Sequence, residues 1–294
     1  MGSVFALSSA FFWAVAVILF KKAGDTFSPI TLNIYKSIVA MVLISITMIV
    51  LDIPIFPDVD ARTWWVLSLS GFLGITLADV CFFTALNRLG ASMVAVVECL
   101  YLPCVLFFSF ILLGERMGPW GVFGSILVMS AILVGSIPSK PLKSKNKKTD
   151  TIAGGIFAGV LAMVFLALGI VIAKDVLDHS NVFWATLVRV VAGCISLAAI
   201  VACHPKRRQF MEEIKFSKAW VTAFPASVCG NYIALLFWVA GMKYTTASRA
   251  AVLNQMCTIF IFILAWLWLK EKMTGQKIIA ICLAVTGAYL AIIN

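Results

Sequence analysis

The chain has 294 residues, of which 62% are hydrophobic and only 12% are charged, and it carries a net charge of +10. Its mean hydropathy is +1.05. This is the composition of a polytopic membrane protein, and it leaves too little polar chain for a soluble catalytic or nucleic-acid-binding domain. We expect an all-α membrane protein, because the apolar runs are continuous and a helix satisfies its own backbone in lipid.

Ten apolar windows are long enough to cross a bilayer, which takes about 20 helical residues. In chain order they cover residues 3–20, 29–51, 63–84, 91–113, 119–137, 152–173, 182–202, 218–240, 247–269 and 275–293. A polar, basic segment at 138–151 separates the first five windows from the last five. We therefore expect a first unit at 1–137, a linker lying beside anionic headgroups rather than on nucleic acid, and a second unit at 152–294.

The second unit repeats part of the first. Leu89-Gly-Ala-Ser92 precedes an apolar run that ends in Leu113-Gly-Glu-Arg-Met117, while Thr245-Thr-Ala-Ser248 precedes one that ends in Leu269-Lys-Glu-Lys-Met273. Glu115 and Glu271 are 156 positions apart. Because each unit holds five spans, the second must enter the membrane from the opposite side, which predicts two inverted five-helix repeats.

Basic residues predict the orientation. Loops after odd-numbered spans hold sixteen Lys and Arg residues, against five in the other loops, so the odd loops should be cytoplasmic and both termini external. Eight cysteines and two histidines are scattered without metal-ligand spacing, so we expect no metal and no cofactor.

Besides Lys218, Arg249 and Lys277 at span ends, four charged residues fall well inside the predicted spans: Lys36, Asp79, Glu98 and Arg189. Counted from the nearest loops, all four lie at similar depth near the bilayer midplane. One hypothesis is that they line a substrate cavity, in which Glu98 or Asp79 takes up a proton and the cations hold a carboxylate or another anionic group. The alternative is a static ion pair of Lys36 with Asp79 or Glu98.

Several uncharged residues join this candidate site. The offset aligns Glu98 with Asn254, and Ser248, Ala251, Gln255 and Thr258 form a small or polar stripe that should face the interior. Asn231, Trp13 and Trp238 are further candidates for the cavity wall, although amides and indoles at such depths also serve packing alone. Pro103 is expected to kink its helix just past Glu98.

The run Ala85-Leu-Asn-Arg-Leu-Gly-Ala-Ser92, then Pro103, then Leu112-Leu-Gly-Glu-Arg116, resembles the EamA pattern of the drug/metabolite transporter superfamily, and 240–287 resembles its second copy. The resemblance implies ten helices in an inverted five-plus-five arrangement and secondary transport of small metabolites such as amino acids, often as exporters. It also implies cytoplasmic termini, in conflict with the charge count. Departures are Lys270 and Ile259 where the first copy has Gly114 and Pro103, and Glu98 where the family is generally apolar or small.

We therefore expect a multi-pass protein of the bacterial cytoplasmic membrane, monomeric or homodimeric, with a small metabolite and a proton as candidate partners. Without a Walker-type loop, gradients rather than ATP should supply the energy. The other readings are a non-transporting subunit or channel, and an enzyme acting on lipid-linked substrates, for which no nucleophile or metal cluster is present in the sequence.

Overall fold

The computed structural model describes residues 1–23, 28–89, 94, 97–136, 149–203, 220–269 and 275–293, and all regular elements in these ranges are helical. The first half contains α1 (Gly2–Ala23), α2 (Pro29–Val50), α3 (Ala61–Gly71), η1 (Phe72–Leu77), α4 (Ala78–Leu89), α6 (Tyr101–Phe108), η2 (Ser109–Leu113) and α7 (Pro119–Ser136). The second half contains α8 (Thr149–His179), α9 (Val182–Cys203), α11 (Trp220–Ser227), η3 (Val228–Ala234), α12 (Leu235–Tyr244), α13 (Ala247–Asn254), α14 (Cys257–Leu269) and α15 (Gly275–Ile293).

By length and composition, seven helical stretches within the described residues could cross a membrane, and three further apolar helices are shorter. Predicted and observed ends agree closely for α9 and α15. The prediction was short for α8, which continues beyond residue 173 to His179 and so includes Lys174 and Asp178. It also missed interruptions inside the third, eighth and ninth windows, whereas one in the fourth window, just past Glu98, was expected.

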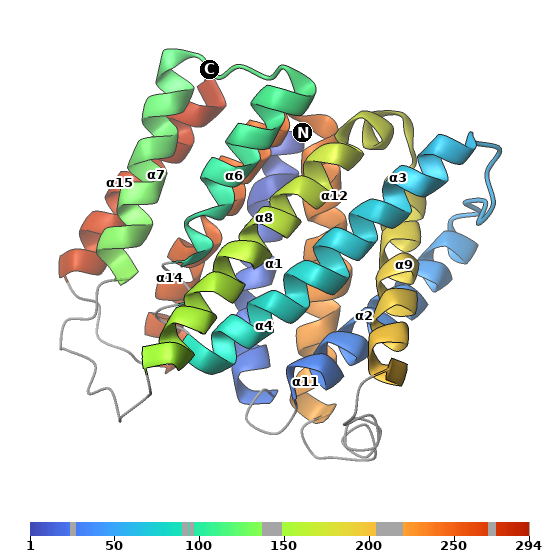
Figure 1. Cartoon of the computed structure of the whole chain (residues 1–294). Helices are drawn as coiled ribbons and strands as arrows, with labels where there is room; N and C mark the ends of the chain where they lie inside the picture. The colour runs from blue at the N-terminus through green and yellow to red at the C-terminus, as the bar shows by residue number, and fades with distance from the viewer. Residues whose placement is uncertain are drawn as a thin grey trace.

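Three segments, η1, η2 and η3, are π-helical, which means that their backbone hydrogen bonds span five residues instead of four. η1 joins α3 to α4, and η3 joins α11 to α12, so each group forms one long rod (Figure 1). Phe72 and Val228, where η1 and η3 begin, are 156 positions apart. The π turn therefore occurs at the same place in both copies of the sequence.

α7 and α15 lie side by side and run antiparallel at one edge of the bundle (Figure 1). Their backbones touch, because a Cβ on Gly124 would lie 2.5 Å from the Gly287 carbonyl oxygen, and one on Gly287 would lie 2.5 Å from that of Gly124. The two helices occupy equivalent places in the two copies. An antiparallel pair of equivalent helices is what a two-fold axis in the membrane plane produces, whereas parallel repeats would give a parallel pair.

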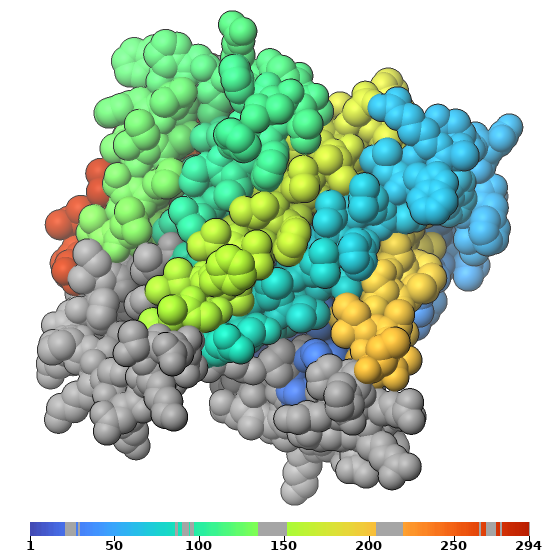
Figure 2. Space-filling model, viewed as in Figure 1, coloured from blue at the N-terminus to red at the C-terminus, as the bar shows by residue number. Residues whose placement is uncertain are grey.

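α1 packs against α11, η3, α12, α13 and α14, so the first helix is embedded among helices of the second half. α1 begins and α15 ends at the same end of the bundle (Figure 1). The face seen in Figure 2 is formed mainly by α6, α7, α8 and the α3–η1–α4 rod. Large apolar side chains such as Trp65, Phe107 and Ile195 are more than half exposed, as expected for helices that face lipid.

Candidate functional site

Two helices are interrupted at equivalent positions. Cys99 and Leu100 form a turn before α6, and Gln255 and Met256 form a turn between α13 and α14. The backbone pattern is the same in both: Leu100 N–H donates to the Val97 carbonyl at 3.0 Å, and Met256 N–H donates to the Leu253 carbonyl at 3.1 Å. Each bond spans three residues instead of four, which tightens the helix and frees neighbouring carbonyls.

Pro103 does not account for this interruption alone. Pro103 lacks the N–H that a regular helix would use at this position, as the sequence suggested. The second copy, however, has Ile259 at the equivalent position and is interrupted at the same place. The expectation of a proline kink is therefore corrected to a turn that lies before Pro103 and that the second copy forms without proline.

Glu98 and Asn254 are the last helical residues before these turns. The two turns are linked, because Gln255 Nε2 donates to the Glu98 backbone carbonyl at 3.2 Å. Asn254 Oδ1 is buried without a hydrogen-bond partner, and the Glu98 carboxylate forms no ion pair with any residue that the structure describes. The site thus presents one carboxylate without an ion pair among the described residues and one amide oxygen without a hydrogen-bond partner.

Of the stripe expected on the ninth window, Ser248, Ala251 and Gln255 are buried and Thr258 is partly exposed. Ala250 and Leu253, on the opposite side of α13, are buried as well, so burial is not confined to the stripe. Asn231, which lies in η3, is also buried at 6% exposure. Trp13 approaches the same π turn, since a Cβ on Gly230 would lie 3.4 Å from its ring. These side chains therefore belong to the interior of the bundle, around the interrupted and π-helical segments.

Lys36 pairs with Asp79. Their Nζ and Oδ2 atoms are 2.7 Å apart, with side-chain exposures of 3% and 21%. Lys36 Nζ also lies 5.4 Å from the centre of the Phe83 ring. Of the two acids that the sequence offered to Lys36, the structure selects Asp79 and leaves Glu98 outside the pair.

Arg189, on α9, is only 1% exposed. Its guanidinium carbon lies 5.2 Å from the centre of the Trp238 ring, and Tyr101 is a further neighbour. Gly71 makes this position possible, because a Cβ there would fall 2.1 Å from the Arg189 carbonyl oxygen. The four ionisable residues accordingly divide into a Lys36–Asp79 pair, an Arg189–Trp238 stack and a separate Glu98.

Glu115 has a role that sequence reasoning missed. Its Oε1 accepts the Ala247 N–H at 2.9 Å, and its Oε2 accepts the Ser248 N–H at 3.0 Å and hydroxyl at 2.8 Å. The carboxylate thus covers the N-terminus of α13, where free N–H groups and the helix dipole favour a negative charge. Gly114 makes the approach possible, since it ends η2 with a left-handed φ of 66°. The Glu and the Ala-Ser pair that recur in both copies were the available signal, but nothing in them indicated that they meet across the repeat.

A polar pocket of about 550 Å³ adjoins this contact, lined by Glu115, Lys174, Asp178, Lys243 and neighbouring residues. Lys174 Nζ donates to Asp178 Oδ1 at 2.5 Å, and Lys243 Nζ donates to the Ser180 carbonyl. The sequence placed Lys174 and Lys243 in loops, whereas both lie on helices. The pocket lies at the end of the bundle where α8 and α12 end.

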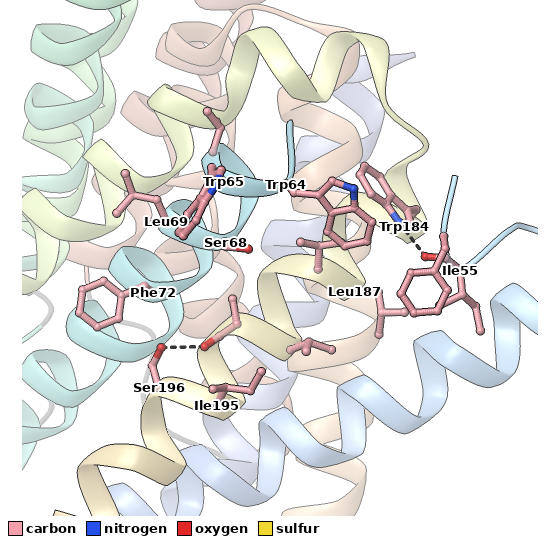
Figure 3. Close-up of a pocket in the computed structure, with 15 residues that line it drawn as sticks. Ile55, Trp64, Trp65, Ser68, Leu69, Phe72, Trp184, Leu187, Ile195 and Ser196 are labelled. Carbon is pink, nitrogen blue, oxygen red and sulfur yellow. Dashed lines mark hydrogen bonds between the residues drawn. The ribbon is translucent and has the colours of Figure 1, made fainter. Parts of the chain in front are cut away.

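A second, apolar groove of about 680 Å³ lies between α3 and α9 (Figure 3). Trp64, Trp65 and Trp184 line it, and Trp184 Nε1 donates to the Ile55 carbonyl at 3.0 Å. It contains none of the candidate site residues and no charged side chain. Its lining includes Trp65 and Ile195, which are 76% and 66% exposed, so the groove belongs to the lipid-facing surface.

One known protein family matches both halves of the chain. The model of the EamA-like transporter family matches residues 1–137 and again residues 153–293. The chain belongs to the EamA-like transporter family. It is accordingly an integral, multi-pass membrane transporter and not an enzyme, consistent with membership of the drug/metabolite transporter superfamily.

Two further similarities cover nearly the whole of this EamA protein. An uncharacterized transporter of Archaeoglobus fulgidus is 22% identical over 291 residues, which are 98% of this chain and 96% of the archaeal protein. A crystal structure described only as that of a protein superposes with a TM-score of 0.80 at 16% identity, covering 99% of this chain and 96% of the other. The second similarity establishes the shared fold alone.

Proposed function

We propose that this protein is a secondary active transporter that exports a small metabolite, such as an amino acid or a related solute, across a bacterial cytoplasmic membrane. Ten spans form two inverted five-helix repeats, 1–137 and 152–294, joined by the basic linker 138–151. The protein works as a monomer or homodimer. The solute passes through a midplane cavity between the repeats.

The observation that carries this proposal is the pair of equivalent helix interruptions at 99–100 and 255–256. Transporters built from inverted repeats bind their solutes near the midplane, where discontinuous helices expose backbone groups that no longer bond within the helix. Here each interruption directly follows a polar side chain, Glu98 in one repeat and Asn254 in the other. The antiparallel contact of α7 with α15 and the matching π turns support the inverted symmetry.

Glu98 is the proposed coupling group. Its carboxyl lies beside the interruption and forms no ion pair with the described cations, so it is free to gain and lose a proton as the cavity opens to either side. Asp79 is held by Lys36 and neutralises a charge between packed helices. Trp13, Trp238, Asn231 and Gln255 form walls of the same cavity.

The first experiment identifies a solute. Cells with and without the protein are compared for resistance to a panel of amino acids and related metabolites, and each protective solute is then tested in proteoliposomes under an imposed pH gradient. A transporter accumulates the solute against its concentration gradient. Equilibration without accumulation would indicate a channel, and no movement of any protective solute would contradict the proposal.

The second experiment tests coupling. Glu98→Gln keeps the size of the side chain, but its neutral amide does not take up and release a proton as a carboxylate does. It should therefore abolish proton-driven accumulation while solute exchange down a gradient continues. Asp58→Asn, at an exposed position, serves as the matched control for loss of one carboxylate. Normal accumulation with intact pH dependence in Glu98→Gln would transfer the coupling role to Asp79.

A further inference from the structure

Arg189 lacks a negatively charged partner within the described part of the protein. Its side chain is almost completely buried, Nε and Nη1 have no hydrogen-bond acceptor, and no described Asp or Glu lies within ion-pair distance. Trp238 covers it as a π surface, with the guanidinium carbon 5.2 Å from the ring centre. Trp238 and the neighbouring Tyr101 supply no formal charge to neutralise it.

The contrast with Lys36 makes this arrangement informative. Both cations are 3% exposed or less, and both lie against an aromatic ring, yet only Lys36 has an acid, Asp79 at 2.7 Å. A buried charge without a partner is strongly unfavourable, and buried polar groups in native proteins normally have partners. A buried guanidinium for which the described residues provide no acid therefore calls for an anion that arrives from outside the chain.

Position restricts what this anion is. Arg189 lies in the interior, with its backbone against Gly71 and its Nη2 atom 3.5 Å from where a Cβ on Gly74 would lie. The groove that faces lipid is lined by Leu187, Val188 and Val191, the neighbours of Arg189 on α9, but not by Arg189 itself. A lipid phosphate is thus disfavoured, which leaves an anionic group of the solute itself, and a carboxylate fits the planar fork of a guanidinium.

We propose that Arg189 binds a carboxylate of the transported solute, while the Trp238 ring packs against the guanidinium and fixes its orientation. This inference rests on the proposed transport function and names the class of solute. The carboxylate accepts two charge-assisted hydrogen bonds from one edge of the guanidinium, Nε with Nη2 or Nη1 with Nη2, and so supplies one of the acceptors missing from the described protein groups. The other members of the cavity wall then contact the rest of the solute.

The test uses matched pairs of small molecules on the purified full-length protein in phosphatidylcholine, so that anionic lipid is absent. Acetate is compared with acetamide, phenylacetate with phenylacetamide, and L-phenylalanine with L-phenylalaninamide. Ligand-dependent thermal stability is measured, with sodium chloride as an inorganic anion control. Stabilisation by at least one carboxylate, with its amide binding at least about tenfold more weakly, is expected. Equal effects of acid and amide, equal effects of chloride, or no effect of any carboxylate would each overturn the inference.

Variants assign the effect to this residue. Arg189→Gln should weaken binding of the effective carboxylate at least about tenfold, and Arg189→Lys should weaken it less because the charge is kept. Arg62→Gln is the control, since Arg62 is an exposed arginine paired with Asp175. Wild-type affinity in a folded Arg189→Gln would overturn the inference. If that variant does not fold, the inference is judged from the wild-type protein alone, by whether it binds the acid more tightly than the matching amide.

A negative result for carboxylate binding by Arg189 can be distinguished from a negative result for transport. A protein that accumulates only solutes without an anionic group in proteoliposomes is still a transporter, but Arg189 then does not bind carboxylate. A protein that binds carboxylates through Arg189 yet accumulates no solute leaves this inference standing and contradicts transport.

Discussion

Glu115 and Ser248 join the two halves of the protein: the Glu115 carboxylate accepts both the backbone N–H and the hydroxyl of Ser248. Glu115 lies between η2 and α7 in the first half, and Ser248 lies in the first turn of α13 in the second half. The contact lies beside the polar pocket that Glu115, Lys174 and Lys243 line. A movement that parts the first half from α13 at this end would have to separate the two residues.

Glu115→Ala should therefore destabilise the protein by about 1 to 3 kcal/mol, the usual cost of losing hydrogen bonds to a charged group. Ser248→Ala, which removes only the hydroxyl contact, should cost less. Both are measured by denaturant unfolding in detergent, with Asp58→Asn as the exposed control. If Glu115→Ala were as stable as the control, the contact would contribute nothing to the stability of the folded protein.

The Lys36–Asp79 pair is predicted to be structural. Lys36→Met leaves a partly buried carboxylate without its cation and should cost about 3 to 5 kcal/mol, whereas the double variant Lys36→Met/Asp79→Leu should recover much of that loss. Unfolding of the two single variants and the double variant completes the cycle. Transport by a stable double variant would support a static role, and a folded double variant without transport would instead place the pair in the mechanism.

Gly71 should tolerate no side chain. Gly71→Ala places a methyl group 2.1 Å from the Arg189 carbonyl oxygen, so α3 and α9 must separate, at a cost of about 1 to 3 kcal/mol or more. Gly275→Ala is the matched control, because a Cβ there meets nothing within 4 Å. Thermal stability of the two variants in the same detergent is the measurement. Equal stability would show that α3 and α9 adjust without strain.

Orientation follows from the basic loops and is tested by labelling. In a cysteine-free background, a membrane-impermeant reagent applied from outside should label a cysteine at position 294 and not one at position 145. Both positions lie outside the described residues, as does Glu271, so the expectation that Glu115 and Glu271 mark opposite surfaces stays a prediction. The reverse labelling pattern would place the termini in the cytoplasm, as the family resemblance implies.

The sequence predicted helix positions well where an apolar run ends at polar or helix-breaking residues, as in α9 and α15. It could not predict η1, because Phe72-Leu-Gly-Ile-Thr-Leu77 is as apolar as the helices on either side and a π turn has no compositional signature. Depth along a helix could be counted from the loops, but the direction of a side chain around the helix could not. For that reason Lys36 had two possible partners in the sequence and has one in the structure.

The π turns also change which residues of each long rod lie on the same face of the helix. A regular α-helix advances about 100° per residue, and a π turn takes one more residue to complete its circle, so everything after it is rotated backward by roughly that angle. Residues before Phe72 and after Leu77 therefore belong to two separate helical wheels, and the same holds before Val228 and after Ala234. Asp79 faces Lys36 on the second wheel. Deleting one residue within η1 would merge the two wheels and turn Asp79 about a quarter of a circle away from its partner.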